Sequence, residues 1–176
     1  MVKSFNLRKL TLILTVILGA STFLGVNTKS NCQLFTIYLV RHAEKDSGSN
    51  PPLTQCGEER AQYLSTFFSE VHLDAVYSTD YVRTKSTALP TAQSKQLDIE
   101  EYSADDLEAF SKVLLEREQD ALVVGHSNTT GALAGLLVGE ELPDIDLDTY
   151  NRIYQVVIHK KNSRLHLFYT SFNCND

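Results

Sequence analysis

The 176-residue sequence lacks an excess of basic residues. It has 16 Lys and Arg against 22 Asp and Glu, for a formal net charge of −6, whereas a nucleic-acid phosphate backbone calls for a basic protein face. Internal repeats, low-complexity tracts and a second domain-sized segment are also missing. With 43% hydrophobic residues, the chain is long enough for one domain with a substantial core and short for two. We therefore exclude nucleic acid as the main partner and expect one domain.

Acidic residues are absent before Glu44. Three basic residues within positions 3–9 instead precede an apolar run at positions 10–20, which is the pattern of a secretory signal peptide. Extended to position 26, the same run could be an uncleaved anchor, although it is marginal for spanning about 30 Å of hydrocarbon. The basic residues on the N-terminal side of the run keep that end of the chain in the cytoplasm, so in either case the domain that follows is delivered outside it. We expect residues 1–30 to be a signal peptide or N-terminal membrane anchor plus a short linker, and residues 31–176 to be exported to the periplasm or the exterior.

Cysteine is scarce, with three residues in the whole chain. Cys32 precedes the first expected strand and Cys174 follows the last, so a disulfide that ties the two ends of the domain is the pairing to test first. Cys56 would then be left over. A small buried apolar role is more typical of such a residue than a reactive thiol.

Three expected strands end in a cation or an imidazole. The apolar run at residues 35–40 stops at Arg41-His42, the run at residues 75–78 leads to a helix that carries Arg83, and the run at residues 121–125 stops at His126. Ligands bind at the carboxyl ends of strands in open α/β sheets. We expect these four side chains to meet at one edge of one sheet.

The remaining segments predict helices between the strands. Thr54 is the expected N-cap of the first helix, residues 81–93 form the second with a kink or early stop at Pro90, and a Ser103-x-x-Asp106 capping box opens the third. Residues 131–138 form the fourth helix.

A surface loop at residues 139–148 is expected next, followed by a hairpin of residues 152–160 and 164–172. The fold class is α/β, a three-layer α/β/α arrangement with a mostly parallel central sheet and a C-terminal antiparallel hairpin.

These motifs, in this order, resemble the histidine phosphatase superfamily, also called phosphoglycerate mutase-like. The resemblance implies that His42 is the phosphate-accepting nucleophile and that Arg41, Arg83 and His126, with Ser127 beside it, bind the phosphate. Ala43 stands where the family usually has Gly. The segments that carry the resemblance are Leu39-Val40-Arg41-His42-Ala43-Glu44, Pro52-Leu53-Thr54-Gln55-Cys56-Gly57, Tyr77-Ser78 through Arg83-Thr84 to Thr87-Ala88, and Gly125-His126-Ser127.

The chemistry explains these residue types. Two guanidiniums offer fixed planar donors to a phosphate dianion. His42 must attack as a neutral imidazole with one nitrogen held as a donor, most easily by a backbone carbonyl. Nearby arginines lower its pKa. The histidines lie far apart and have no metal-ligand spacing, so neither a metal nor a cofactor is expected.

The leaving alkoxide also needs a proton. The Glu motif that many family members carry after the third strand, which we expect here at residues 99–102, is missing, and Ser127 stands where other members have Asp. Glu44 ranks first as the general acid because it lies on the nucleophile loop, followed by Glu101 and Asp105.

The sequence thus predicts an exported, metal-independent phosphatase that acts on a small phosphorylated substrate through phosphohistidine at His42. The alternatives are a mutase-type phosphotransferase, a protein phosphohistidine phosphatase, and a catalytically idle phosphate-binding module.

Overall fold

The computed structural model describes residues 34–174. The expected leader at residues 1–30 and Cys32 lie outside this range, and the predictions about the leader stay predictions. Within the range, no helix has both the length and the apolar character that a bilayer crossing requires.

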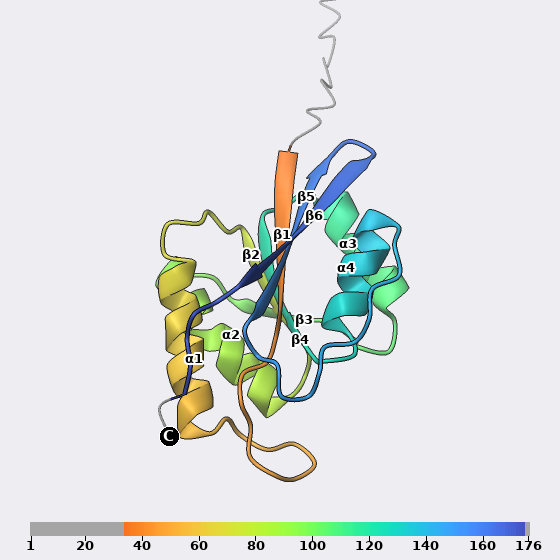
Figure 1. The fold of residues 1–176 in the computed structure, drawn as a ribbon. Helices are drawn as coiled ribbons and strands as arrows, with labels where there is room; N and C mark the ends of the chain where they lie inside the picture. Colours follow the sequence, from red (N-terminus) through yellow and green to blue (C-terminus); the bar gives the residue numbers. More distant parts are fainter. Residues whose placement is uncertain (1–33, 175–176) are drawn as a thin grey trace, which may run out of the picture. The chain divides into compact units, whose positions relative to one another are not determined.

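A mixed six-stranded sheet forms the centre of the domain (Figure 1). Its order is β3-β2-β4-β1-β5-β6; β1 through β4 run parallel, and β5 and β6 add the antiparallel hairpin. This confirms the predicted sheet. The strands are β1 (Leu34–Arg41), β2 (Ala75–Ser78), β3 (Ile99–Glu101), β4 (Ala121–Gly125), β5 (Arg152–His159) and β6 (Asn162–Tyr169).

Helices cover both faces of the sheet, which confirms the three-layer arrangement (Figure 1). The helices are α1 (Gln55–Phe67), α2 (Val82–Lys95), α3 (Leu107–Arg117) and α4 (Thr130–Val138). The apolar side chains of α1 and α2 pack with Val76 and Leu122, while those of α3 and α4 pack with Leu39 and Val123. Strands β2 and β4 are buried along their whole length, which is why their sequences are almost uninterrupted apolar runs.

The helix ends differ from the sequence prediction in two places. Helix α2 does not stop at Pro90 but continues to Lys95, because buried residues on both sides of the proline, including Ala88 and Ala92, hold it against the sheet. The N-cap of α3 is Asp106 itself, whose carboxylate accepts from the Ala109 N–H. The cap predicted at Thr54 is confirmed, since its hydroxyl accepts from the Gly57 N–H at 3.1 Å.

The disulfide joins Cys56 to Cys174, so the predicted Cys32–Cys174 pairing is wrong. After β6, the C-terminal tail runs back along α1 (Figure 1) and brings the Cα atoms of the two cysteines to 5.5 Å, within bonding reach. Sequence position alone could not reveal the direction of this tail. Cys56 is therefore not the unpaired buried residue that we expected.

Candidate active site

The structure brings the two predicted histidines together at the carboxyl edge of the sheet. Arg41 at the end of β1 pairs in register with Gly125 at the end of β4, and the His42 N–H donates to the Gly125 carbonyl at 2.9 Å. The imidazole rings of His42 and His126 consequently lie 5.6 Å apart, centroid to centroid.

His42 is held as a neutral imidazole with a defined tautomer. Its Nδ1 lies 2.7 Å from the Ala43 carbonyl, and since a carbonyl only accepts, Nδ1 carries the proton and Nε2 has the free lone pair. Burial lowers the pKa of His42 to about 3, and the charges of Arg41, Arg83 and His126 act in the same direction. The hydrogen bond to the Ala43 carbonyl raises the pKa of His42, but by less than burial lowers it. The arginines lower this pKa as expected, but their effect is smaller than that of burial.

The second imidazole, His126, is fixed by a chain of two threonine hydroxyls. Its Nε2 lies 3.0 Å from Thr79 Oγ1, which donates to Thr84 Oγ1 at 2.9 Å. Thr84 in turn donates to backbone carbonyls. Thr79 therefore accepts from His126 Nε2–H, and Nδ1 of His126 is left as an acceptor. Burial, followed by Arg83 and Arg41, lowers the pKa of His126 to about 4.

The hydroxyl chain was missed by the sequence analysis. Thr79 and Thr84 stand within a motif that carries the family resemblance. No spacing rule, however, separates a threonine that orients a histidine from one that caps a helix, because the bond from Thr79 reaches His126, 47 positions further along the chain.

Arg83 lies in the first turn of α2 and reaches the same site. Its Nη2 is 3.3 Å from His126 Nδ1, and its guanidinium carbon lies 4.3 Å from the centre of the Tyr81 ring. The Tyr81 ring is also 5.0 Å from that of His126. Burial lowers the pKa of Arg83 from its ordinary value, yet a guanidinium keeps its charge near neutral pH.

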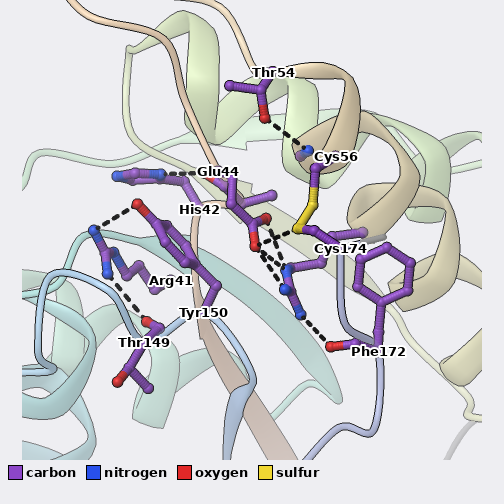
Figure 2. Close-up of polar contacts among 12 residues, drawn as sticks. Arg41, His42, Glu44, Thr54, Cys56, Thr149, Tyr150, Phe172 and Cys174 are labelled. Carbon is purple, nitrogen blue, oxygen red and sulfur yellow. Dashed lines mark hydrogen bonds and ion pairs between the residues drawn. A yellow bond between two sulfur atoms is a disulfide. The ribbon is translucent and has the colours of Figure 1, made fainter. Parts of the chain in front are cut away.

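Arg41 is held by the loop between α4 and β5. Its Nη1 donates to the carbonyls of Asp146, Leu147 and Thr149 at 2.7 to 3.0 Å, and Tyr150 stacks on the guanidinium (Figure 2). Residues 139–148 are mostly exposed, as predicted for a surface loop, and Ile145 is the one buried residue among them. The carbonyls of this loop also serve as the acceptors that the buried Arg41 requires.

Both arginines keep one buried donor free. Among the described residues, Nε of Arg41 and Nε of Arg83 are buried without a hydrogen-bond partner. An unpaired buried donor costs about 1–3 kcal/mol. Both guanidiniums act on His42, whose pKa their charges lower, so an anion bound beside His42 would satisfy such donors.

Two of the three predicted proton donors are engaged in ion pairs. Glu44 accepts from Nε and Nη2 of Arg60 at 2.6 to 3.0 Å, and its carboxylate is directed toward Cys174 (Figure 2). Glu101 pairs with Lys85 at 2.5 Å on the surface. Asp105 is exposed, and its backbone N–H donates to Ser103. An ion pair engages a deprotonated carboxylate, which has no proton to donate, so the geometry weighs against Glu44 and Glu101.

The loop that follows His42 is held closely against α1. A Cβ atom at Gly57 would collide with the Glu44 carbonyl oxygen, which also accepts from the Thr54 N–H at 3.0 Å. After β4, Ser127 uses its backbone carbonyl to accept from the Ile145 N–H at 2.8 Å. Ser127 therefore fixes the loop that holds Arg41, in addition to its predicted place beside the substrate.

Two groups of potential metal ligands exist among the described residues, and both lie outside the histidine pair. The first consists of Glu44 with the two disulfide cysteines, whose sulfurs are bonded to each other. The second consists of His72, Asp74 and Asp120, whose carboxylates already accept backbone N–H groups.

The fold and this site together define an α/β protein that brings two neutral histidines and two arginines to one edge of its sheet. The family model described as "Histidine phosphatase superfamily (branch 1)" matches residues 37–106. Over this segment, 70 of the 176 residues, the chain is similar to that superfamily.

A curated relative and two solved structures are similar to this chain. Phosphoserine phosphatase 1 of Hydrogenobacter thermophilus is 35% identical over 71 residues, covering 36% of this chain and 34% of the relative. The match thus spans about a third of that relative's length. A mycobacterial glucosyl-3-phosphoglycerate phosphatase shares the fold with a TM-score of 0.65 at 13% identity, covering 79% of this chain and 100% of its own. The protein histidine phosphatase SixA, complexed with tungstate, has a TM-score of 0.63 at 19% identity, with 77% and 97% covered.

Proposed function

We propose that this protein is an exported, metal-independent phosphatase that hydrolyses phosphomonoesters through a phosphohistidine intermediate on His42. The observation that carries the proposal is the state of His42: a buried neutral imidazole whose Nδ1 is held by the Ala43 carbonyl and whose Nε2 is free. The two guanidiniums and His126 beside it supply the charge and the donors that a phosphoryl group needs.

The reaction follows from this arrangement in two steps. In the first, His42 Nε2 attacks phosphorus, the N–P bond forms and the bond to the leaving oxygen breaks with its electron pair. In the second, water attacks the phosphohistidine, the N–P bond breaks, and inorganic phosphate and neutral His42 are released. Arg41 and Arg83 stabilise the charge on the equatorial oxygens in both transition states.

The engaged carboxylates favour substrates with good leaving groups. Glu44 and Glu101 are both in ion pairs, so neither of them has a proton to give to a poor alkoxide leaving group. A protein phosphohistidine phosphatase is the second candidate, because an imidazole leaving group demands less acid assistance than an alkoxide. SixA-type neighbours support this candidate by name, although the predicted leader opposes an intracellular substrate.

Export is supported by two features. The basic and then apolar residues at positions 3–20 match a signal peptide, and the Cys56–Cys174 disulfide suits an oxidising compartment. Fractionation of cells that express the full chain, with N-terminal sequencing of the mature protein, tests this part. A protein that remains in the cytoplasm with residues 1–30 intact would contradict it.

Turnover of p-nitrophenyl phosphate in the presence of EDTA tests the chemistry. We expect turnover that chelation does not reduce, that His42→Ala abolishes, and that the exposed-histidine control His72→Ala preserves. The intermediate should appear as an acid-labile, base-stable phosphoryl adduct on His42. Turnover that is lost on chelation, or that survives His42→Ala, would overturn the mechanism. Phosphate binding without turnover would favour the idle binding module.

A further inference from the structure

Tyr150 makes two contacts with the phosphate-pocket arginine of β1. Its ring centre lies 4.1 Å from the Arg41 guanidinium carbon, and its hydroxyl accepts from Arg41 Nη2 at 3.4 Å (Figure 2). The same ring lies 6.3 Å from that of His42. A guanidinium over a tyrosine face is attracted by the ring quadrupole, and the long hydroxyl contact contributes less.

The carbonyl contacts of Arg41 show which edge of its guanidinium is left for a ligand. Nη1 is fully used by the three loop carbonyls. Nε is buried without a partner, and Nη2 has only its long contact with the Tyr150 hydroxyl. The Nε and Nη2 donors lie on one edge, which is the edge that Arg60 presents to the Glu44 carboxylate. That edge can hold two oxygens of a phosphate side by side.

We infer that Tyr150 is a positioning residue for the phosphate pocket: by stacking on Arg41 it keeps the Nε and Nη2 edge of the guanidinium turned to the phosphoryl group beside His42. The inference rests on the proposed function of the site. The loop carbonyls anchor the far end of the guanidinium, and the Tyr150 ring fixes its plane. Without the ring, the guanidinium can rotate about its anchored end, and the paired donors lose their alignment.

Two variants separate the contributions of the ring and the hydroxyl. Tyr150→Phe keeps the stacking ring, so we expect kcat/KM for p-nitrophenyl phosphate and the affinity for inorganic phosphate to fall less than about threefold. Tyr150→Leu removes the ring, and we expect both quantities to fall roughly tenfold, the size of a partly desolvated cation–π contact. Tyr169→Leu, at an exposed tyrosine at the end of β6, is the matched control and should change neither.

A double-variant cycle distinguishes positioning from a general structural role. In an Arg41→Ala background, Tyr150→Leu should change phosphate affinity and kcat/KM less than twofold, because the residue through which Tyr150 acts is gone. Equal losses in both backgrounds, or a Tyr150→Leu variant with unchanged phosphate affinity, would overturn the inference. If Tyr150→Leu does not fold, Tyr150→Met takes its place, because methionine keeps an apolar side chain without a ring. The results expected of Tyr150→Leu, and those that would overturn the inference, then apply to Tyr150→Met.

Phosphate affinity, measured by titration calorimetry, does not depend on turnover. If the wild-type protein binds phosphate but does not hydrolyse the ester, the proposed function is wrong. The phosphate affinities of the Tyr150 variants still test the inference in that case. A wild-type protein that does not bind phosphate would remove the inference.

Discussion

Replacing the Cys56–Cys174 disulfide should lower the stability of the domain by several kcal/mol. The bridge joins residues 118 positions apart, and the entropy of closing a loop of that length in the unfolded chain corresponds to about 5 kcal/mol at 25 °C. Observed losses for native disulfides extend down to about 2 kcal/mol. Since a domain of about 140 residues unfolds with an entropy of roughly 0.3 kcal/mol per degree, the melting temperature should fall by about 7 to 16 °C.

The structure adds a local contribution to this loss. The tail that carries Cys174 places the Phe172 ring over the Arg60 guanidinium, 4.8 Å from its central carbon, and the Phe172 carbonyl accepts from Arg60 at 3.3 Å. Arg60 is buried and pairs with Glu44 on the loop that follows His42. Release of the tail exposes this ion pair to water, which weakens it.

Thermal unfolding followed by circular dichroism measures the effect on the double variant Cys56→Ser/Cys174→Ser. The double replacement prevents a freed cysteine from pairing with Cys32. The Cys32→Ser control should melt as the wild type does. A double variant that melts within about 2 °C of the wild type would refute the entropic reasoning.

Peptide mapping without reduction tests the pairing itself. Trypsin should release residues 46–60 linked to residues 165–176, because cleavage follows Lys45, Arg60 and Arg164. A peptide of residues 30–41 linked to residues 165–176 would instead restore the pairing with Cys32 and contradict the structure.

Three further predictions concern the site. The pKa values of His42 and His126 are lowered to about 3 and about 4. At pH 5 both histidines are therefore neutral in the folded protein, whereas the same histidines in the unfolded chain are protonated. The free energy of unfolding should fall as the pH drops below 6.5, by up to about 2 kcal/mol per histidine at pH 5. Urea unfolding at pH 7 and pH 5 measures this, and equal stability at both would contradict the neutral pair. Thr79→Val leaves His126 Nε2–H without its acceptor, and kcat/KM should fall about tenfold, in line with an unpaired buried donor; unchanged kinetics would show that Thr79 does not orient the ring. Aryl phosphates should be hydrolysed much faster than alkyl phosphates, with rates that fall as the leaving-group pKa rises; a flat series would indicate that one of the carboxylates acts as an acid after all.

Local patterns in the sequence were sufficient for most of the fold. Buried strands such as residues 121–125 are continuous apolar runs, and amphipathic helices repeat their apolar residues at helical spacing, because burial acts on neighbours along the chain. The meeting of Arg41-His42 with His126 followed from one topological rule, that parallel strands bring their carboxyl ends to one edge. The resemblance to a family added roles that no periodicity contains.

The tertiary structure decided what depends on contacts between distant segments. The tail that pairs Cys174 with Cys56, the Arg60 guanidinium that occupies Glu44, and the loop carbonyls that hold Arg41 each join residues far apart in the chain. The sequence by itself determined which side chains reach the edge of the sheet. Their orientation, protonation and partners were decided by the folded chain, because hydrogen bonds and burial depend on directions and distances that a linear pattern does not contain.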